Sequence, residues 1–192
     1  MKLTPGDPAI DPNNFWVFGY ASLMWRPGFA FAEAQAAMLQ GYARDMCFLS
    51  IHYRGTPQVP GLVCGLMPVS QGGCRGRAYR ITPADVTDAV TYLDGRELIT
   101  GIYVPRHHPL RLDDGRDVLA RVYVADTAHE QFVGTWPDSD KTAAIVRGVG
   151  SEGRSLDYLA SVVDHLRQVG INDAHMMALL KSAQALEKQE AR

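Results

Sequence analysis

The sequence predicts an α+β protein, with a small curved β-sheet or barrel, helices packed outside it, and a helical C-terminal third. Three observations lead to this class. Short apolar runs rich in aromatic and β-branched residues fall before residue 126, which is typical of strands. One capped amphipathic helix interrupts them after residue 81. From about residue 140, the apolar residues recur at helical spacing.

The strands are predicted from apolar runs that end at turn residues. Gly72-Gly73 separates two of these runs, and Asp113-Asp114-Gly115 between two others is a strong hairpin signal. The alanine-rich segment Ala30–Leu39 is expected to form a short helix or an irregular crossing. The expected strands are Phe15–Phe18, Tyr42–Ile51, Leu62–Val69, Cys74–Ile81, Ile102–Leu112 and Val118–Ala125.

The helices are predicted from capping residues and from apolar stripes. Thr82-Pro83-Ala84-Asp85 supplies a hydroxyl cap, a proline at the first helical position and an acid in the first turn. The helix that follows is expected to loosen or end at Gly95. Three further helices are expected at Asp140–Val149, Leu156–Val169 and Asp173–Leu186. One apolar face of the second comprises Leu156, Leu159, Val163 and Leu166, with Gly170 at its stop.

The composition is that of a soluble globular protein: 46% of the 192 residues are hydrophobic and 21% charged. A formal net charge of -2 gives no electrostatic reason to expect nucleic acid or anionic lipid as a partner, and no apolar run is long enough to span a membrane. Three cysteines without a Cys-x-x-Cys pair fit a reducing, cytoplasmic location. We expect a flexible leader over residues 1–13 and a single domain over residues 14–192.

The turn after the first strand is the first candidate site. Gly19, Tyr20, Ala21, Ser22, Leu23 and Met24 follow the buried run Phe15–Phe18. The small side chains at this point allow a close backbone approach, and the N–H groups at such a turn can bind a carboxylate or an oxyanion. An ordinary tight turn explains the same pattern.

Glu97 is the second candidate. It follows the amphipathic helix and precedes Leu98 and Ile99, so loss of hydration is expected to raise the pKa of its carboxyl and make it a better base near neutral pH. Arg96 is adjacent, but neighbours on a helix point in different directions and need not pair. A solvated glutamate in a surface turn is the alternative.

The sequence gives less support to a serine nucleophile or to a metal site. Ser22 lacks a Gly-x-Ser-x-Gly elbow and a recognisable histidine partner, so a hydroxyl that contacts backbone or ligand is favoured over a nucleophile. His107 and His108 face opposite sides of a strand and have no third ligand at suitable spacing, so no metal site is expected.

Three further residues are open to two interpretations. Arg54, on a loop stiffened by prolines, either clamps a substrate carboxylate by a forked pair of hydrogen bonds or is an ordinary surface arginine. Tyr123 and Tyr158 either line a pocket or are buried with bonded hydroxyls.

An ordered set of motifs resembles the ChaC-type γ-glutamylcyclotransferases, from Trp16 to about Ala183. The opening signature of that family, Phe-Gly-Tyr-Gly-Ser-Leu followed by an aromatic, is matched by Phe18-Gly19-Tyr20-Ala21-Ser22-Leu23-Met24-Trp25. The other matching segments are Gly41-Tyr42 with Arg44, Arg54-Gly55 with Pro60-Gly61, Gly76–Tyr79, Tyr92-Leu93-x-x-Arg96-Glu97, Ala120–Val124, and Arg147-Gly148 with Gly153 and Leu156-x-Tyr158-Leu159.

The resemblance implies a γ-glutamylcyclotransferase-like fold and two site roles. The turn Gly19–Met24 would hold a γ-glutamyl group, and Glu97 would be the general acid/base. The chain departs from the family pattern at two positions. The second glycine of the signature is Ala21 here, and the arginine often found after Pro-Gly is Leu62. If position 21 needs a positive φ, alanine costs about 1 kcal/mol or more.

The implied activity is that of a lyase on glutathione, which needs no cofactor. The α-amine of the substrate attacks its own γ-amide carbonyl, which releases 5-oxoproline and cysteinylglycine. Two rivals remain: the same cyclisation on another γ-glutamyl amide, and a non-catalytic γ-glutamyl-binding or transport-regulating protein. The expected partner is therefore a small molecule, and the sequence gives no oligomeric state.

Overall fold

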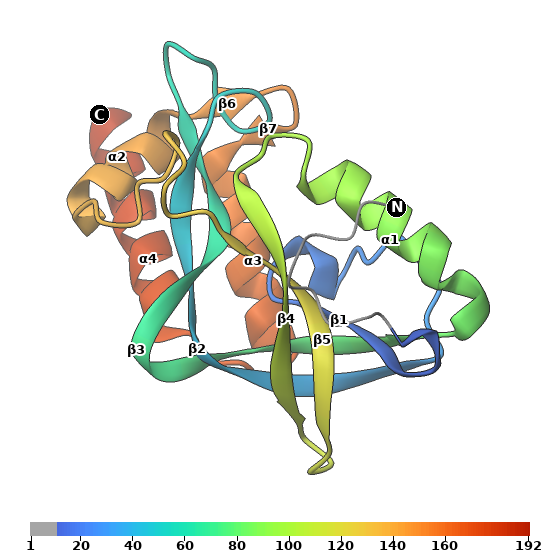
Figure 1. Ribbon diagram of the computed structural model, residues 1–192. Helices are drawn as coiled ribbons and strands as arrows, with labels where there is room; N and C mark the ends of the chain where they lie inside the picture. The colour runs from blue at the N-terminus through green and yellow to red at the C-terminus, as the bar shows by residue number, and fades with distance from the viewer. Residues whose placement is uncertain (1–10) are drawn as a thin grey trace. The chain divides into compact units, whose positions relative to one another are not determined.

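The computed structural model describes residues 11–192, and the chain divides into two compact units (Figure 1). Over the described residues, unit 1 comprises residues 11–43 and 68–126, and unit 2 comprises residues 44–67 and 127–192. Most of the expected leader lies outside the described residues. In the part of the expected leader that is described, Asp11 caps the short 3-10 helix η1 (Pro12–Asn14) by accepting a hydrogen bond from the Asn13 N–H. The single domain over residues 14–192 stays a prediction.

Five strands form a closed barrel in the order β1-β3-β2-β4-β5, which confirms the predicted fold class. β1 pairs antiparallel with β3 and parallel with β5. The strands are β1 (Phe15–Gly19), β2 (Glu33–Ser50), β3 (Gly61–Ile81), β4 (Tyr103–Leu112) and β5 (Asp117–Ala125). All five residues of β1 are buried, as expected for an apolar run without a polar side chain.

In unit 1, the helix α1 (Val86–Glu97) covers part of the core. The short 3-10 turn η3 (Pro83–Asp85) precedes it, so the chain enters the helix at the predicted place. The apolar stripe of α1 packs into one cluster with β1, β3 and β5. That cluster contains Phe15, Val17, Leu23, Tyr79, Ile81, Val86, Ala89, Val90, Leu93 and Tyr123.

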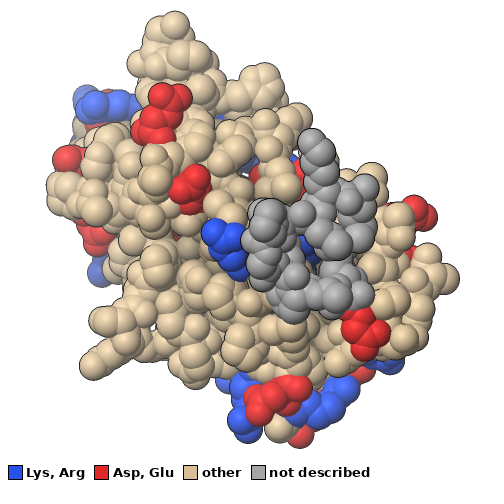
Figure 2. All heavy atoms as spheres, viewed as in Figure 1, with Lys and Arg blue, Asp and Glu red and all other residues tan. Residues whose placement is uncertain are grey.

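The hairpin β4–β5 confirms the Asp-Gly signal, with Gly115 at a φ of 90° in its turn. Charged side chains of both signs gather near the turn, at the lower edge of Figure 2. Arg111 pairs there with Asp117, and Arg75 pairs with Asp113. These pairs are exposed, so each contributes at most about 1 kcal/mol to stability.

In unit 2, three helices pack on one another (Figure 1): α2 (Asp138–Arg147), α3 (Ser155–Gln168) and α4 (Ala174–Glu190). The short hairpin of β6 (Val149–Gly150) and β7 (Gly153–Arg154) connects α2 to α3. The predicted apolar face of α3 is buried, and Gly170, at a φ of 73°, ends that helix. Asp173 caps α4 by accepting a hydrogen bond from the Met176 N–H.

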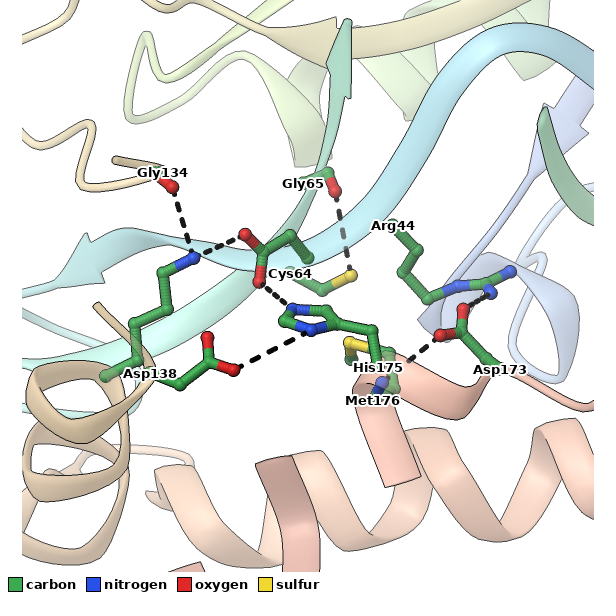
Figure 3. A network of polar contacts seen from close by, with 10 residues as sticks. Arg44, Cys64, Gly65, Gly134, Asp138, Asp173, His175 and Met176 are labelled. Atoms are coloured by element: carbon green, nitrogen blue, oxygen red, sulfur yellow. Dashed lines mark hydrogen bonds and ion pairs between the residues drawn. The ribbon is translucent and has the colours of Figure 1, made fainter. Parts of the chain in front are cut away.

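A buried carboxylate joins three elements of unit 2 (Figure 3). Asp45 on β2 accepts from Lys141 Nζ on α2 at 2.5 Å and contacts His175 Nε2 on α4 at 2.9 Å. The Lys141 side chain is only 3% exposed, and it also donates to the Gly134 carbonyl. Burial by itself raises the pKa of Asp45, but the hydrogen bonds from His175 and Lys141 outweigh burial and lower it. The same hydrogen bond to Asp45 raises the pKa of His175.

Three predictions about elements are wrong. Ala30–Leu39 is neither a helix nor an irregular crossing, because β2 begins at Glu33. Buried Ala37 and Leu39 alternate with more exposed neighbours, and Ala37 pairs with Leu112. The burial of every second residue favours a strand, and it outweighs the weak preference of alanine for a helix.

The other two corrections concern glycine. Gly72-Gly73 does not separate two strands, because β3 runs through it, with Gly72 at a φ of 94° inside the ladder. Gly95 does not end α1, which continues to Glu97. An exposed glycine in a helix costs about 1 kcal/mol, which is less than burial of Val90 and Leu93 contributes.

Among residues 11–192, no helix combines the length and apolar character needed to cross a membrane.

Candidate active site

The turn after β1 folds back on the end of the strand. The 3-10 helix η2 (Ser22–Met24) begins shortly after Gly19 ends β1. A Cβ placed on Gly19 would lie 3.0 Å from Leu23 Cβ and 3.3 Å from the Met24 nitrogen, which is tighter than almost all real contacts. The turn therefore packs closely against Gly19, where a Cβ would require Leu23 or Met24 to move by a few tenths of an ångström.

The backbone of the turn is held by its own hydrogen bonds. The Met24 N–H donates to the Ala21 carbonyl, and the Arg26 N–H donates to the Ser22 carbonyl, both at 2.8 Å. The first N–H groups of a helix have no acceptor within it, and in η2 these belong to Ser22 and Leu23. Within the described part of the chain, neither of these two N–H groups donates to a backbone carbonyl of a turn or loop.

Ala21 fits the turn without a left-handed backbone. Its φ is −134°, and no described residue other than glycine has a positive φ. The cost that alanine would carry at a positive φ therefore does not arise. Ala21 is 8% exposed, so its methyl group adds little bulk at the surface.

Tyr79 of β3 fixes the far end of the turn. Its hydroxyl lies 3.0 Å from the Leu23 carbonyl and 2.9 Å from the Met24 carbonyl, both of which can accept its proton. The side chains of Leu23, Met24 and Tyr20 are buried within the protein, at 5%, 2% and 6% exposure. What the turn presents outward is therefore mainly its backbone and the Ser22 hydroxyl.

Glu97 is the last residue of α1, and its side chain is 16% exposed. Burial raises the pKa of its carboxyl, and the positive charge of Arg96 partly offsets that rise. The direction agrees with the prediction from the sequence. A carboxyl whose pKa lies nearer to neutral can accept and return a proton more readily at neutral pH.

Arg96 contacts Glu97, a pairing that the sequence left open. Arg96 Nε lies 3.1 Å from Glu97 Oε1. Their Cβ atoms diverge, but both side chains are long enough to meet beside the end of the helix. Arg96 also donates to Ser22 Oγ at 2.9 Å, so it connects the turn with Glu97. Ser22 thus uses its hydroxyl as an acceptor for a side chain, a partner that the sequence did not identify.

A second network joins α1 to β5 one turn before Glu97. Asp94 Oδ1 accepts from Arg121 Nη2 and from the Tyr123 hydroxyl, both at 2.7 Å. Tyr123 is 1% exposed, which agrees with the interpretation of a buried tyrosine with a bonded hydroxyl. The sequence reasoning missed Asp94 and Arg121, because their partners are distant in the chain. The available signal for Arg121 was its position as a charged residue within an otherwise apolar strand, which indicates a buried charged partner.

Arg54 belongs to unit 2, where it lies among residues of the β6–β7 hairpin and α3. Its guanidinium donates to the Glu152 carbonyl and lies 5.3 Å from the centre of the Tyr158 ring. The backbones of the Arg54 loop and the hairpin are in close contact, because the Glu152 N–H donates to the Tyr53 carbonyl at 2.9 Å. A role for Arg54 in substrate binding stays a prediction.

Leu62, the second departure from the family pattern, is fully buried in β3. Its N–H and carbonyl both bond the hydroxyl of Ser155, at 3.0 and 2.8 Å. No group of three or more His, Cys, Asp or Glu residues that could hold a metal ion occurs within residues 11–192. His108 instead contacts the Tyr42 hydroxyl at 2.9 Å.

The fold is that of the γ-glutamylcyclotransferases. A crystal structure of the yeast γ-glutamylcyclotransferase specific to glutathione superposes with a TM-score of 0.81 at 24% identity, over 89% of this chain and 96% of that one.

The chain belongs to the ChaC-like protein family, whose family model matches residues 15–186. A glutathione-specific γ-glutamylcyclotransferase of Escherichia coli is 35% identical over 182 residues, which cover 92% of this chain and 75% of the relative. The human glutathione-specific γ-glutamylcyclotransferase 1 is 30% identical over 174 residues, covering 88% of this chain and 78% of the relative.

Proposed function

We propose that the protein is a carbon–nitrogen lyase that cyclises the γ-glutamyl group of glutathione and releases 5-oxoproline and cysteinylglycine. One observation carries the proposal most: a largely buried carboxylate, Glu97, is linked through Arg96 to the signature turn. The names of the E. coli and human relatives supply the substrate. As a partner we therefore propose a small molecule, and a cytoplasmic location stays a prediction.

Glu97 acts as general base and then as general acid in this proposal. An α-amine has a pKa of about 8, so it is largely protonated at neutral pH and must lose a proton before it attacks. The ammonium first loses one proton to solvent. The resulting neutral amine nitrogen then forms a bond to the γ-carbonyl carbon while Glu97 accepts a second proton from that nitrogen. The bond from that carbon to the cysteine nitrogen then breaks, and Glu97 returns the proton to the leaving nitrogen. The reaction balances with proton transfers alone.

The turn η2 binds the γ-glutamyl group through its backbone. The N–H groups of Ser22 and Leu23 are suited to the developing oxyanion or to the α-carboxylate, because both are anions that accept from backbone donors. The nucleophile and the electrophile belong to one molecule, so a bound, folded conformation supplies much of the rate advantage. In this scheme Gly19 and Ala21 act by keeping the turn small, and Tyr20, Leu23 and Met24 act by holding it against the core.

The decisive assay incubates the purified protein with glutathione and measures 5-oxoproline and cysteinylglycine. A panel of other γ-glutamyl amides tests the alternative substrate class, to which Ala21 and Leu62 are relevant as departures from the family pattern. Absence of turnover on the whole panel would contradict the enzymatic proposal and favour a γ-glutamyl-binding protein.

Glu97→Gln tests the role of the carboxylate. The amide keeps the shape but accepts no proton at neutral pH, so we expect kcat to fall about 10²-fold or more. Glu130→Gln is the matched control, since it makes the same change at an exposed glutamate and should leave kcat unchanged. A Glu97→Gln variant with kcat within about threefold of the wild type would show that another group is the base.

A further inference from the structure

Arg96 uses all three guanidinium nitrogens at once. Nε contacts Glu97 Oε1 at 3.1 Å, and Nη2 donates to Ser22 Oγ at 2.9 Å. Nη1 donates to the Arg26 carbonyl at 2.8 Å and to the Tyr92 hydroxyl at 3.1 Å. One planar group therefore bonds the turn η2, the residue that leaves the turn, the preceding turn of α1 and the carboxylate of the proposed base.

This arrangement differs from an ordinary surface ion pair. Its partners come from two separate segments, around Ser22 and around Glu97, whose sequence separation is large. The directions of the donors are fixed by the plane of the guanidinium, so the positions of the acceptors relative to one another are fixed as well. The Arg96 side chain is 27% exposed, which leaves it partly shielded from solvent.

We propose that Arg96 is a positioning residue, which holds the turn η2 and the Glu97 carboxylate at the separation that the cyclisation requires. The inference rests on the proposed function and deepens it, because it assigns a role to a residue between the two halves of the site. Lysine has a single nitrogen and cannot bond all four acceptors in this geometry.

Arg96 has a second, electrostatic effect on the same carboxylate. Among the described residues it is the charged group in contact with Glu97, and it opposes the rise in the pKa of Glu97 that burial causes. Asp94, one turn earlier on α1, is paired with Arg121. Loss of the Arg96 charge would therefore raise the pKa of Glu97 further and protonate the base over a wider pH range.

Two variants separate geometry from charge. Arg96→Lys keeps the positive charge but loses the fork, by which we mean the set of hydrogen bonds that the planar guanidinium makes. We expect kcat to fall about 10- to 100-fold, while the acidic limb of the pH profile stays in place. Arg96→Gln loses both, so kcat should fall and the acidic limb should move to higher pH. Arg80→Lys is the control: Arg80 pairs with Glu33 away from the site, and its replacement should change neither kcat nor the profile.

Ser22→Ala shows whether Arg96 acts through the turn. The variant removes one acceptor of the fork but leaves the contact to Glu97, so kcat should fall without a shift of the acidic limb. If the two residues act together, the double variant Ser22→Ala/Arg96→Lys should lose less than the product of the two single losses. Full multiplication of the two losses would contradict a joint action.

The outcomes that overturn the inference are specific. Arg96→Lys with kcat within about twofold of the wild type would show that the fork is not needed. A rise in KM with unchanged kcat would show that Arg96 binds substrate uniformly and does not position the base.

If the wild type turns over no γ-glutamyl compound, the proposed function fails separately. The carboxyl titration of Glu97, followed by NMR and assigned with Glu97→Gln, then decides whether Arg96 and Glu97 are coupled. An unchanged titration in Arg96→Gln would overturn the inference, and a shift to higher pH would support the coupling.

Discussion

Ala21 shows how one residue of the signature turn can differ from the family pattern without a change of backbone. Its φ of −134° is not in the left-handed region that favours glycine, so the backbone does not need a glycine there for a positive φ. Gly19 is different, because a Cβ at that position would press on Leu23. The two small residues of the turn therefore have different reasons to be small.

Ala21→Gly is expected to leave the chemistry intact and to lower stability. Glycine would fit the same backbone but lose more conformational freedom on folding, which costs about 0.5 to 1 kcal/mol. The kcat for glutathione should stay within about threefold of the wild type. Thermal denaturation and steady-state kinetics measure the two effects, with Ala30→Gly at an exposed position as the control. A change in kcat of about tenfold would instead show that the Ala21 methyl group contacts the substrate.

At the scale of elements, buried charges join segments that apolar packing alone would leave less precisely placed. In unit 1, Asp94 of α1 binds Arg121 and Tyr123 of β5. In unit 2, Asp45 of β2 binds Lys141 of α2 and His175 of α4 (Figure 3). Asp45 is buried, and its two partners compensate for the water that it loses. Asp94 is 35% exposed, and it is the buried guanidinium of Arg121 that gains a charged partner there.

Lys141→Met should lower the stability of the protein strongly. Methionine fits the space of the lysine stem but leaves the Asp45 carboxylate with only His175 as a charged partner among the described residues. Loss of one member of a buried pair costs about 3 to 5 kcal/mol, and we expect the lower end of that range because His175 remains. Urea denaturation measures the change.

Two comparisons test this mechanism. Arg147→Gln breaks an exposed pair with Glu190 and should cost less than about 1 kcal/mol. The double variant Asp45→Asn/Lys141→Met removes both charges and should recover part of the loss. If the double variant is less stable than Lys141→Met by the full cost of Asp45→Asn, the two residues are not coupled.

The sequence was informative where the signal is local. The helix start at Thr82-Pro83, the apolar face of α3 and the β4–β5 turn depend on residues within one or two turns of each other, and they predicted elements correctly. The class of fold followed from their order. The raised pKa of the Glu97 carboxyl was predicted for the same reason, because its apolar neighbours adjoin it in the chain.

The sequence was less informative where distant residues decide. Ala30–Leu39 became part of a strand because Ala37 pairs with Leu112, and α1 continues past Gly95 with Asp94 bonded to β5. The fork of Arg96 joins residues 70 or more positions apart, at Ser22 and Arg26. No local pattern carries such contacts, so only the folded chain could show them.

At the scale of the whole molecule, the proposed base is expected to cost stability. Burial raises the pKa of Glu97 above its ordinary value of 4.5, so the folded state holds its proton to a higher pH than the unfolded state does. Between these two pKa values the folded state binds more protons than the unfolded state. The contribution of Glu97 to the free energy of unfolding therefore falls as the pH rises through that range.

Glu97→Gln should remove this loss, because the amide resembles the protonated carboxyl at every pH. The stability of the variant relative to the wild type should increase as the pH rises above 4.5, by at most about 1.4 kcal/mol per pH unit for one proton, and then become constant. Denaturation of both proteins from about pH 4 to 9 measures the difference. Because His108 and His175 titrate in both proteins, their contributions cancel in the comparison. If the difference in the free energy of unfolding between Glu97→Gln and the wild type does not change with pH, the fold does not destabilise the Glu97 carboxylate. In that case Glu97→Gln would lose activity without gaining stability at neutral pH.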